Sequence, residues 1–188
     1  ILIGVGLLYA MTGTLNMADM AERVQGIQGS RTVLTAFAFL TVGIALKAAV
    51  FPLHYWLPGA YAYAPSVVSA LLAGTATKVA AYLLLRFIMI FGADFAYVAL
   101  PLGAAIAVLA AIGILIASTS AIFQNDAKRL LAYSSVAHAG YIILGIGLGN
   151  ANGLTGGILH MLNHAMAKGA VFLAMGCVML QIGATHMN

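Results

Sequence analysis

Long apolar runs separated by short polar turns constrain this chain more than any other feature of its sequence. Residues 97–123, for example, contain no charged side chain, and residues 65–87 contain only two. A helix needs about 20 mostly apolar residues to cross a bilayer. Hydrophobic residues make up 63% of the chain and charged residues 6%, whereas a soluble domain has about 25% charged residues. The sequence therefore predicts an integral membrane protein.

Hydropathy and turn residues divide the chain into about six transmembrane helices, so we predict an all-α membrane protein. A membrane β-barrel would need alternating polar and apolar residues over segments of about ten residues, which the sequence lacks. Residues 16–31 are polar and predict a short amphipathic surface segment. The predicted helices cover residues 1–13, 32–49, 65–87, 97–123, 130–148 and 154–182.

The chain begins inside an apolar run, ILIGVGLLYAMTG, without an initiator methionine or a basic segment before it. This start is unlike a signal peptide. We therefore expect residues 1–188 to be a fragment of a single larger transmembrane domain, with helices missing on both sides. Lysine and arginine are divided almost evenly between alternate loops, so they do not determine the membrane orientation.

The connection between the second and third predicted helices, VFPLHYWLPGAYAYAP, contains three prolines and no charged residue. Pro52 lacks an amide proton and frees the carbonyl one turn earlier, so the helix should break just beyond Lys47. Broken backbone at membrane depth survives where protein or a wet cavity surrounds it, as in transporters. An ordinary helix-to-loop transition is the alternative.

Three lysines, Lys47, Lys78 and Lys168, lie inside predicted spans, whereas all four acidic residues lie at predicted helix ends or in loops. A lysine at the centre of a membrane helix costs about 2.5 to 3.5 kcal/mol. Burial favours the neutral amine and a nearby carboxylate favours the charged form, so such lysines can take up and release protons. We therefore predict a proton relay. Snorkelling toward the membrane interface is the alternative, and it is most plausible for Lys47 near the end of its span.

The segment GILHMLNHAMAKGA places His160, His164 and Lys168 four residues apart, on one face of a helix. Imidazole titrates near neutral pH and exchanges protons through both nitrogens, which suits a relay. A metal site is one alternative, but it needs further ligands and the predicted spans contain no acidic residue. A structural histidine pair is another alternative.

Helix 130–148 contains polar residues one turn apart, including Ser135 and His138, in LLAYSSVAHAGYIILG. Serine in a membrane helix often bonds to its own backbone carbonyls. Ser135 and His138 are therefore weaker relay candidates. His54 lies in PLHYWLP, where an aromatic belt at the membrane interface is a sufficient explanation.

Three ordered motifs carry a resemblance to a known family: LKAAVFPLHYWLPGAYAYAPSVVSALLAGTATKVAAYLLLRF, NDAKRLLAYSSVAHAGYIILG and LHMLNHAMAKGAVFL. They resemble the proton-conducting antiporter-like subunits shared by Mrp-type cation/proton antiporters, respiratory complex I and membrane-bound hydrogenases. The resemblance covers nearly the whole chain. The stretch AYAPSVVSALLAGTATKVAAYLLLRF is most similar to the D-type subunits of Mrp antiporters.

The resemblance implies two inverted repeats of five helices, each with a broken helix, and a row of buried lysines. Lys47 matches the lysine of the first broken helix, and Lys78 matches the lysine that some members carry on the next helix. His160, His164 and Lys168 match the histidine and lysine group of the helix before the second broken one. The glutamate that pairs with the first lysine and the terminal Lys or Glu fall outside the match, so this chain alone would not complete a conduit.

The expected function is proton translocation in an Mrp-type cation/proton antiporter, and the alternative is proton pumping in respiratory complex I or a membrane-bound hydrogenase. The expected partners are other membrane subunits, protons, Na⁺ and lipid, in a prokaryotic cell (inner) membrane. No residue is assigned to a cofactor or metal, and the scattered charges do not predict nucleic-acid binding. An enzyme or metal protein that uses the histidines and a purely structural anchor are further hypotheses.

Overall fold

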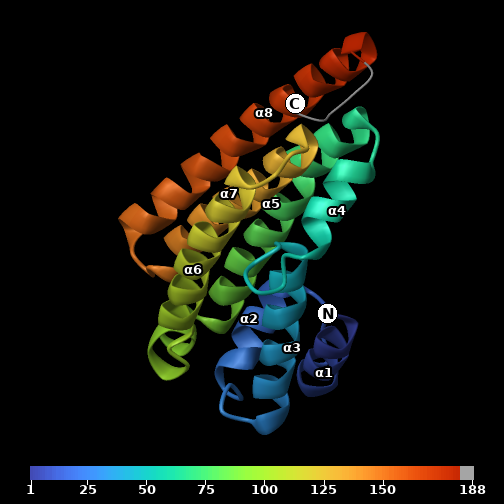
Figure 1. Ribbon diagram of the computed structural model, residues 1–188. Coiled ribbons are helices and arrows are strands. Elements are labelled where there is room, and N and C mark those ends of the chain that lie inside the picture. The colour runs from blue at the N-terminus through green and yellow to red at the C-terminus, as the bar shows by residue number, and fades with distance from the viewer. Residues whose placement is uncertain (183–188) are drawn as a thin grey trace.

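The computed structural model describes residues 1–182, which contain helices and no strand (Figure 1). Apolar runs fold as helices because a helix satisfies its own backbone polar groups, as the hydrocarbon core requires. The helices are α1 (Leu2–Thr12), α2 (Met17–Gln25), α3 (Arg31–Lys47), α4 (Trp56–Tyr63), α5 (Ser66–Phe91), the short π-helical η1 (Asp94–Ala99), α6 (Leu102–Ile122), α7 (Ala127–Gly147) and α8 (Ala151–Ile182).

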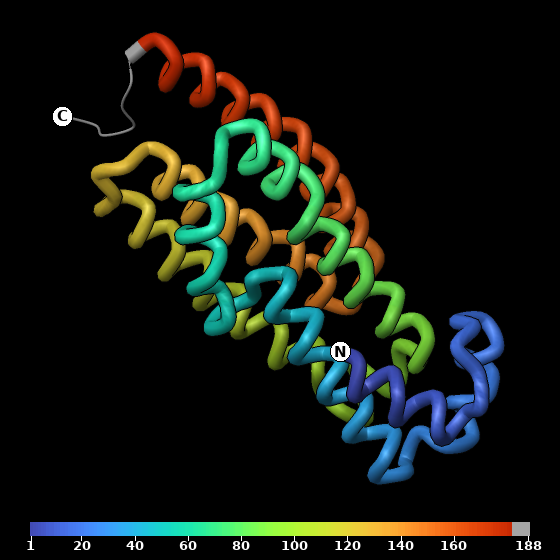
Figure 2. Tube along the Cα trace, turned by 90° about the vertical axis from the view of Figure 1, so that its right-hand side faces the viewer, coloured from blue at the N-terminus to red at the C-terminus, as the bar shows by residue number. Residues whose placement is uncertain are grey.

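Four helices, α5, α6, α7 and α8, are long and apolar enough to cross a membrane. They form a bundle in Figures 1 and 2, with α1, α2 and α3 gathered at one end. All six predicted helices are present, but α1 has 11 residues and α3 has 17, fewer than the roughly 20 that a span needs. The expected six spans are therefore four long helices and two short ones.

The predicted break after Lys47 is confirmed. Helix α3 ends at Lys47, and helical structure resumes at Trp56 in α4. The intervening residues turn back on themselves, with the amide of Leu53 donating to the carbonyl of Val50 at 2.7 Å. The indole of Trp56 donates to the carbonyl of Leu46 at 2.9 Å, so the start of α4 is bonded to the last turn of α3.

The prediction of one helix over residues 97–123 is wrong at its N-terminal end. Residues Asp94–Ala99 form η1, and α6 begins only at Leu102. Pro101 lies between them and has no amide proton to continue a helix. The hydroxyl of Tyr97 donates to the carbonyl of Ile146 at 2.7 Å, which attaches η1 to the last turn of α7.

The predicted amphipathic surface segment is confirmed as α2. Asn16 caps its first turn, and Met20 and Val24 are buried against the bundle. Arg23 donates to the carbonyl of Thr12 at 3.0 Å. Helix α2 therefore covers the C-terminal end of α1.

Helices α7 and α8 cross closely because glycines face each other at their contact. A side-chain carbon on Gly145 would lie 2.6 Å from the carbonyl oxygen of Gly153 and 3.0 Å from the Cα of Gly157. Small residues let membrane helices approach and pack backbone against backbone. This crossing fixes the spacing between the residues that α7 and α8 carry further along.

We expect Gly145→Ala to destabilise the protein, because the added methyl group meets backbone atoms that cannot move independently. Overpacking of this kind costs about 1 to 3 kcal/mol, and it should lower the thermal unfolding temperature of the full-length protein in detergent. Gly156→Ala is the control, because a side-chain carbon there has no heavy atom within 4 Å. Equal unfolding temperatures for the two variants would show that the crossing tolerates a methyl group.

Candidate functional site

The candidate site lies where α5, α7 and α8 meet inside the bundle. It contains Lys78 on α5 and Lys168 on α8, each only 6% exposed. The ammonium of Lys78 donates to the carbonyl of Ala73, and that of Lys168 donates to the carbonyl of Leu131 on α7 at 3.0 Å. Among the described residues, neither lysine has a carboxylate within salt-bridge distance. The hydrogen-bond acceptors of both amines are therefore main-chain carbonyls.

The two lysines approach one contact between antiparallel helices. A side-chain carbon on Gly74 of α5 would lie 3.7 Å from the carbonyl oxygen of Ala165 of α8. Lys78 and Lys168 lie about one turn beyond this contact, on opposite sides of it. Because helical side chains point back toward the N-terminus of their own helix, both lysines extend toward the contact. The two amines therefore converge on the same part of the interface.

Three histidines form a stack beside the lysines. The ring of His138 on α7 lies 4.6 Å from that of His164 and 5.1 Å from that of His160, centroid to centroid, and the planes are nearly parallel. Nδ1 of His138 and Nε2 of His160 are 3.0 Å apart and share a hydrogen bond. His164 is 4% exposed, and neither of its ring nitrogens has a hydrogen-bond partner in the described part of the chain.

A cavity of about 220 Å³ joins the histidines to Lys168. Asn163 also lines the cavity. A water molecule occupies about 30 Å³ of liquid and needs two to four polar partners. The cavity is open to the outside and mostly apolar, and it has room for several water molecules beside the imidazole rings and Lys168.

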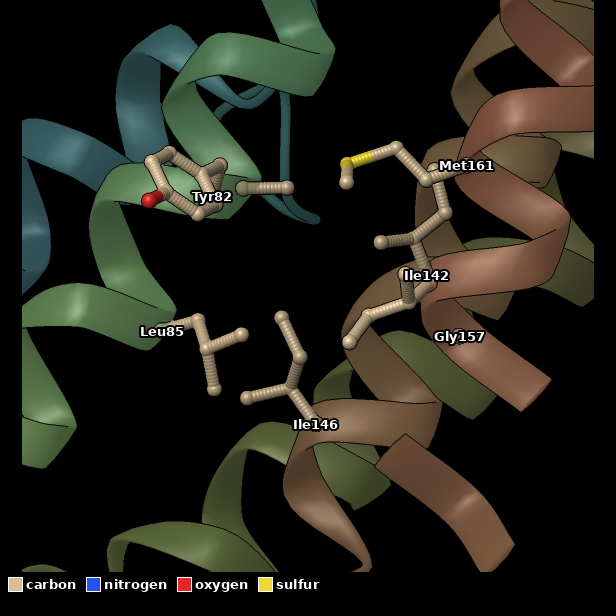
Figure 3. Close-up of a pocket in the computed structure, with 8 residues that line it drawn as sticks. Tyr82, Leu85, Ile142, Ile146, Gly157 and Met161 are labelled. Carbon is tan, nitrogen blue, oxygen red and sulfur yellow. The ribbon is translucent and has the colours of Figure 1, made fainter. Parts of the chain in front are cut away.

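Apolar side chains close the interface between α5 and the α7–α8 pair next to this polar group (Figure 3). A cavity of only about 10 Å³ lies between Leu85 of α5, Ile142 and Ile146 of α7 and Met161 of α8, and the ring of Tyr82 at its edge points away from it. Such a space holds at most about one water molecule. The cluster of lysines and histidines is therefore bounded by a layer that excludes water, one helical turn from Lys78.

The structure does not bring Lys47 into this group. Lys47 is exposed at the end of α3 and has no hydrogen bond or ion pair with any described residue. Ser135 is buried, and its hydroxyl donates to the carbonyl of Leu131 at 2.9 Å. Because Lys168 uses the same carbonyl, Ser135 is connected to the site through a shared acceptor.

Comparison with known proteins places the chain in a family. The family described as NADH:quinone oxidoreductase/Mrp antiporter, TM, matches residues 1–187. The chain belongs to this family. Its members include components of redox complexes and of cation antiporters, as the family's name states.

Two relatives and one solved structure illustrate the similarity. The chain is 46% identical over 187 residues to the N-type subunit of NADH-quinone oxidoreductase from Desulforudis audaxviator, covering 100% of the chain and 37% of the relative. It is 32% identical over 188 residues to the D-type subunit of the Na⁺/H⁺ antiporter from Alkalihalophilus pseudofirmus, covering 100% and 37%. It superposes on a chain of the Mrp complex of Dietzia sp. with a TM-score of 0.87 and 35% identity, covering 99% of this chain and 34% of that one.

The chain spans little more than a third of the length of these family members. The shared fold and the apolar helices establish a multi-pass integral membrane protein of antiporter-like architecture. The expected fold class is therefore confirmed.

Sequence reasoning missed Lys128, which lies just before the predicted helix over residues 130–148. Lys128 is 3% exposed in the first turn of α7, and its amine lies 2.6 Å from the carbonyl oxygen of Ala64. The signal was present in the sequence: Asp126 is a typical N-cap residue, and Lys128 then shares a helix face with Ser135 seven residues later. His54 is also more buried than an interfacial residue, at 3%, and its ring stacks on Tyr55 with centroids 4.9 Å apart.

We expect the histidine stack to bind no stoichiometric transition metal. Among the described residues, no three His, Cys, Asp or Glu side chains are arranged to hold a metal ion together, and the hydrogen bond between His138 and His160 already occupies one nitrogen of each ring. Mass spectrometry of tag-free, full-length protein should find far less than one zinc, copper or nickel ion per site. One metal ion per protein molecule in the wild type, lost in His160→Gln, would support the metal hypothesis instead.

Proposed function

We propose that this chain forms a proton-conducting part of an antiporter-like membrane subunit. The observation that supports it is the convergence of five titratable side chains between apolar helices, without a carboxylate among the described residues near them. A charge so placed is costly, so an ionisable residue inside membrane helices indicates a functional site. The proposed relay consists of Lys78, Lys168, His138, His160 and His164.

The proposed mechanism is stepwise proton transfer within this group. A neutral imidazole accepts a proton at one nitrogen and releases another from the second, so the His138–His160 hydrogen bond provides one transfer step. Water in the cavity beside Lys168 would provide the step between lysine and imidazole. Two positive charges about 10 Å apart repel by roughly 1.7 kcal/mol at an effective dielectric constant of 20, so protonation of one lysine favours proton release from the other.

We assign the remaining predicted residues to supporting places in this relay. Lys47, at the broken helix, is proposed to exchange protons with the group from the α3 side. Ser135 is proposed to hold the Leu131 carbonyl in place for Lys168. Residues 1–188 are proposed to be one part of a larger transmembrane domain, since the chain covers 37% of the relatives that match it.

We expect Lys168→Met and Lys78→Met each to reduce proton transport by about a hundredfold or more, the lower end of what removing a proton-transfer group costs. Methionine preserves the apolar stem of lysine and removes the titratable amine. Transport would be measured as a pH change in vesicles that contain the full complex. Arg86→Met is the control, because Arg86 is an exposed cation further along α5. Wild-type transport in both lysine variants would contradict the relay and leave a structural anchor.

The first candidate for the complete protein is a subunit of an Mrp-type Na⁺/H⁺ antiporter in a prokaryotic cell membrane. The identity to the D-type antiporter subunit and the superposition on the Mrp complex support this candidate. Its partners would be other membrane subunits of the same complex, together with protons, Na⁺ and lipid.

The second candidate is a proton-pumping subunit of a redox complex such as NADH:quinone oxidoreductase. The specific observation that favours it is the 46% identity to the N-type subunit of NADH-quinone oxidoreductase, against 32% to the antiporter subunit. In such a complex the electrons would pass through other subunits, and the chain would supply proton conduction alone.

The driving force distinguishes the two candidates. In vesicles that contain the native complex, the antiporter candidate predicts that a Na⁺ gradient moves protons without an electron donor. The redox candidate predicts that proton movement requires NADH or another donor together with a quinone, and that a Na⁺ gradient alone produces none. Affinity purification of the full-length subunit, followed by identification of the copurifying proteins, provides an independent measurement.

A further inference from the structure

Lys128 is a buried lysine that the proposed relay does not use. Its amine lies 2.6 Å from the carbonyl oxygen of Ala64, the residue that ends α4, and its side chain is 3% exposed. The hydrogen bond joins residues that are 64 positions apart in the sequence. It therefore connects the second half of the broken helix to α7.

The electrostatics of the two helices explain the direction of this contact. A cation in the first turn of a helix is unfavourable, because the N-terminal end carries partial positive charge. Lys128 occupies that place in α7. Its amine, however, lies at the C-terminal end of α4, where unpaired carbonyls carry partial negative charge. The placement is unfavourable for α7 and favourable for α4.

Helix α4 is held on its other sides by different groups. The hydroxyl of Ser69 donates to the carbonyl of Tyr61 at 2.7 Å, and the hydroxyl of Tyr61 donates to the carbonyl of Leu72 at 3.0 Å. These bonds attach α4 to α5. Within residues 1–182, the Lys128 bond is the side-chain hydrogen bond that attaches α4 to α7. It adds to apolar packing, because Leu57 and Tyr61 of α4 share one buried cluster with Ala132, Val136 and Ala137 of α7.

Helix α7 also carries one residue of the relay and the carbonyl that binds another. The Leu131 carbonyl that binds Lys168 lies three residues after Lys128, and His138 lies two turns further along the same helix. A displacement of α4 from α7 would therefore move the break, which spans residues 48–55, relative to the lysines and histidines.

We propose that Lys128 is a positioning residue that clamps α4 to α7 and thereby holds the broken helix in register with the proton relay. The clamp itself follows from the contacts of Lys128, and its effect on transport rests on the function proposed above. The role requires a permanent donor and a positive charge. It does not require that Lys128 release its proton.

The test measures α4 directly in the full-length subunit within its assembled complex. Hydrogen–deuterium exchange of the α4 amides is compared for Lys128→Met, Lys128→Arg and Arg129→Met, together with proton transport in vesicles. Arg129 is the matched control, because it is the neighbouring cation and is exposed. Lys128→Gln replaces the methionine variant if that variant fails to assemble.

Loss of the charged donor in Lys128→Met is expected to speed exchange in α4 by about tenfold or more, since a buried hydrogen bond to a charged group is lost, and to reduce transport. Lys128→Arg should keep slow exchange and most of the transport, because arginine supplies a donor that stays charged. Arg129→Met should match the wild type in both measurements.

Wild-type exchange in Lys128→Met would overturn the clamp. Wild-type exchange with lost transport in Lys128→Arg would also overturn it, and would identify Lys128 as a proton carrier, because arginine cannot pass its proton on. If the arginine side chain fits poorly and the hydrogen bond is lost, exchange of the α4 amides should speed up while transport falls, and this outcome supports the clamp. Normal transport in Lys78→Met and Lys168→Met would refute the relay while leaving the exchange result intact.

Discussion

The structure depends on how buried amines are accommodated between apolar helices. A charge withdrawn from water needs hydrogen-bond acceptors, and Lys78, Lys128 and Lys168 each find one in a main-chain carbonyl. A carbonyl dipole stabilises an ammonium less than a full carboxylate charge does, so the charged and neutral forms of a lysine remain closer in free energy. This balance suits the exchange of protons at Lys78 and Lys168. At Lys128 the same bond connects two helices.

Close contacts between helices bring the buried side chains together in a single site. The glycine contact between α7 and α8 brings the two backbones together near Gly145 and Gly157. Because the helices are antiparallel and rigid, the contact sets the distance at which His138 meets His160 and His164 further along. The stack and the shared hydrogen bond follow from that distance. Apolar residues of α5, α7 and α8 then close the interface beside the polar group.

The broken helix leaves carbonyls that the chain satisfies from outside the helix. Trp56 bonds the Leu46 carbonyl at the end of α3, and Lys128 bonds the Ala64 carbonyl at the end of α4. Backbone without such partners would be costly at membrane depth. The two bonds fix the end of α3 and the end of α4, on either side of the segment where the helix is broken.

Hydropathy, proline position and residue spacing by themselves determined the membrane class, the helical fold, the break after Lys47 and the shared face of His160, His164 and Lys168. Each of these depends on composition or on the local sequence of one segment. Tertiary structure decided the rest. Only the packing of α7 against α8 brings His138, a weaker candidate from its own helix, into the middle of the stack. Only the return of α4 toward α7 buries Lys128, which precedes the predicted helix over residues 130–148. Burial and contact across helices depend on how separate segments meet in space, and the periodicity of a single segment contains no information about that.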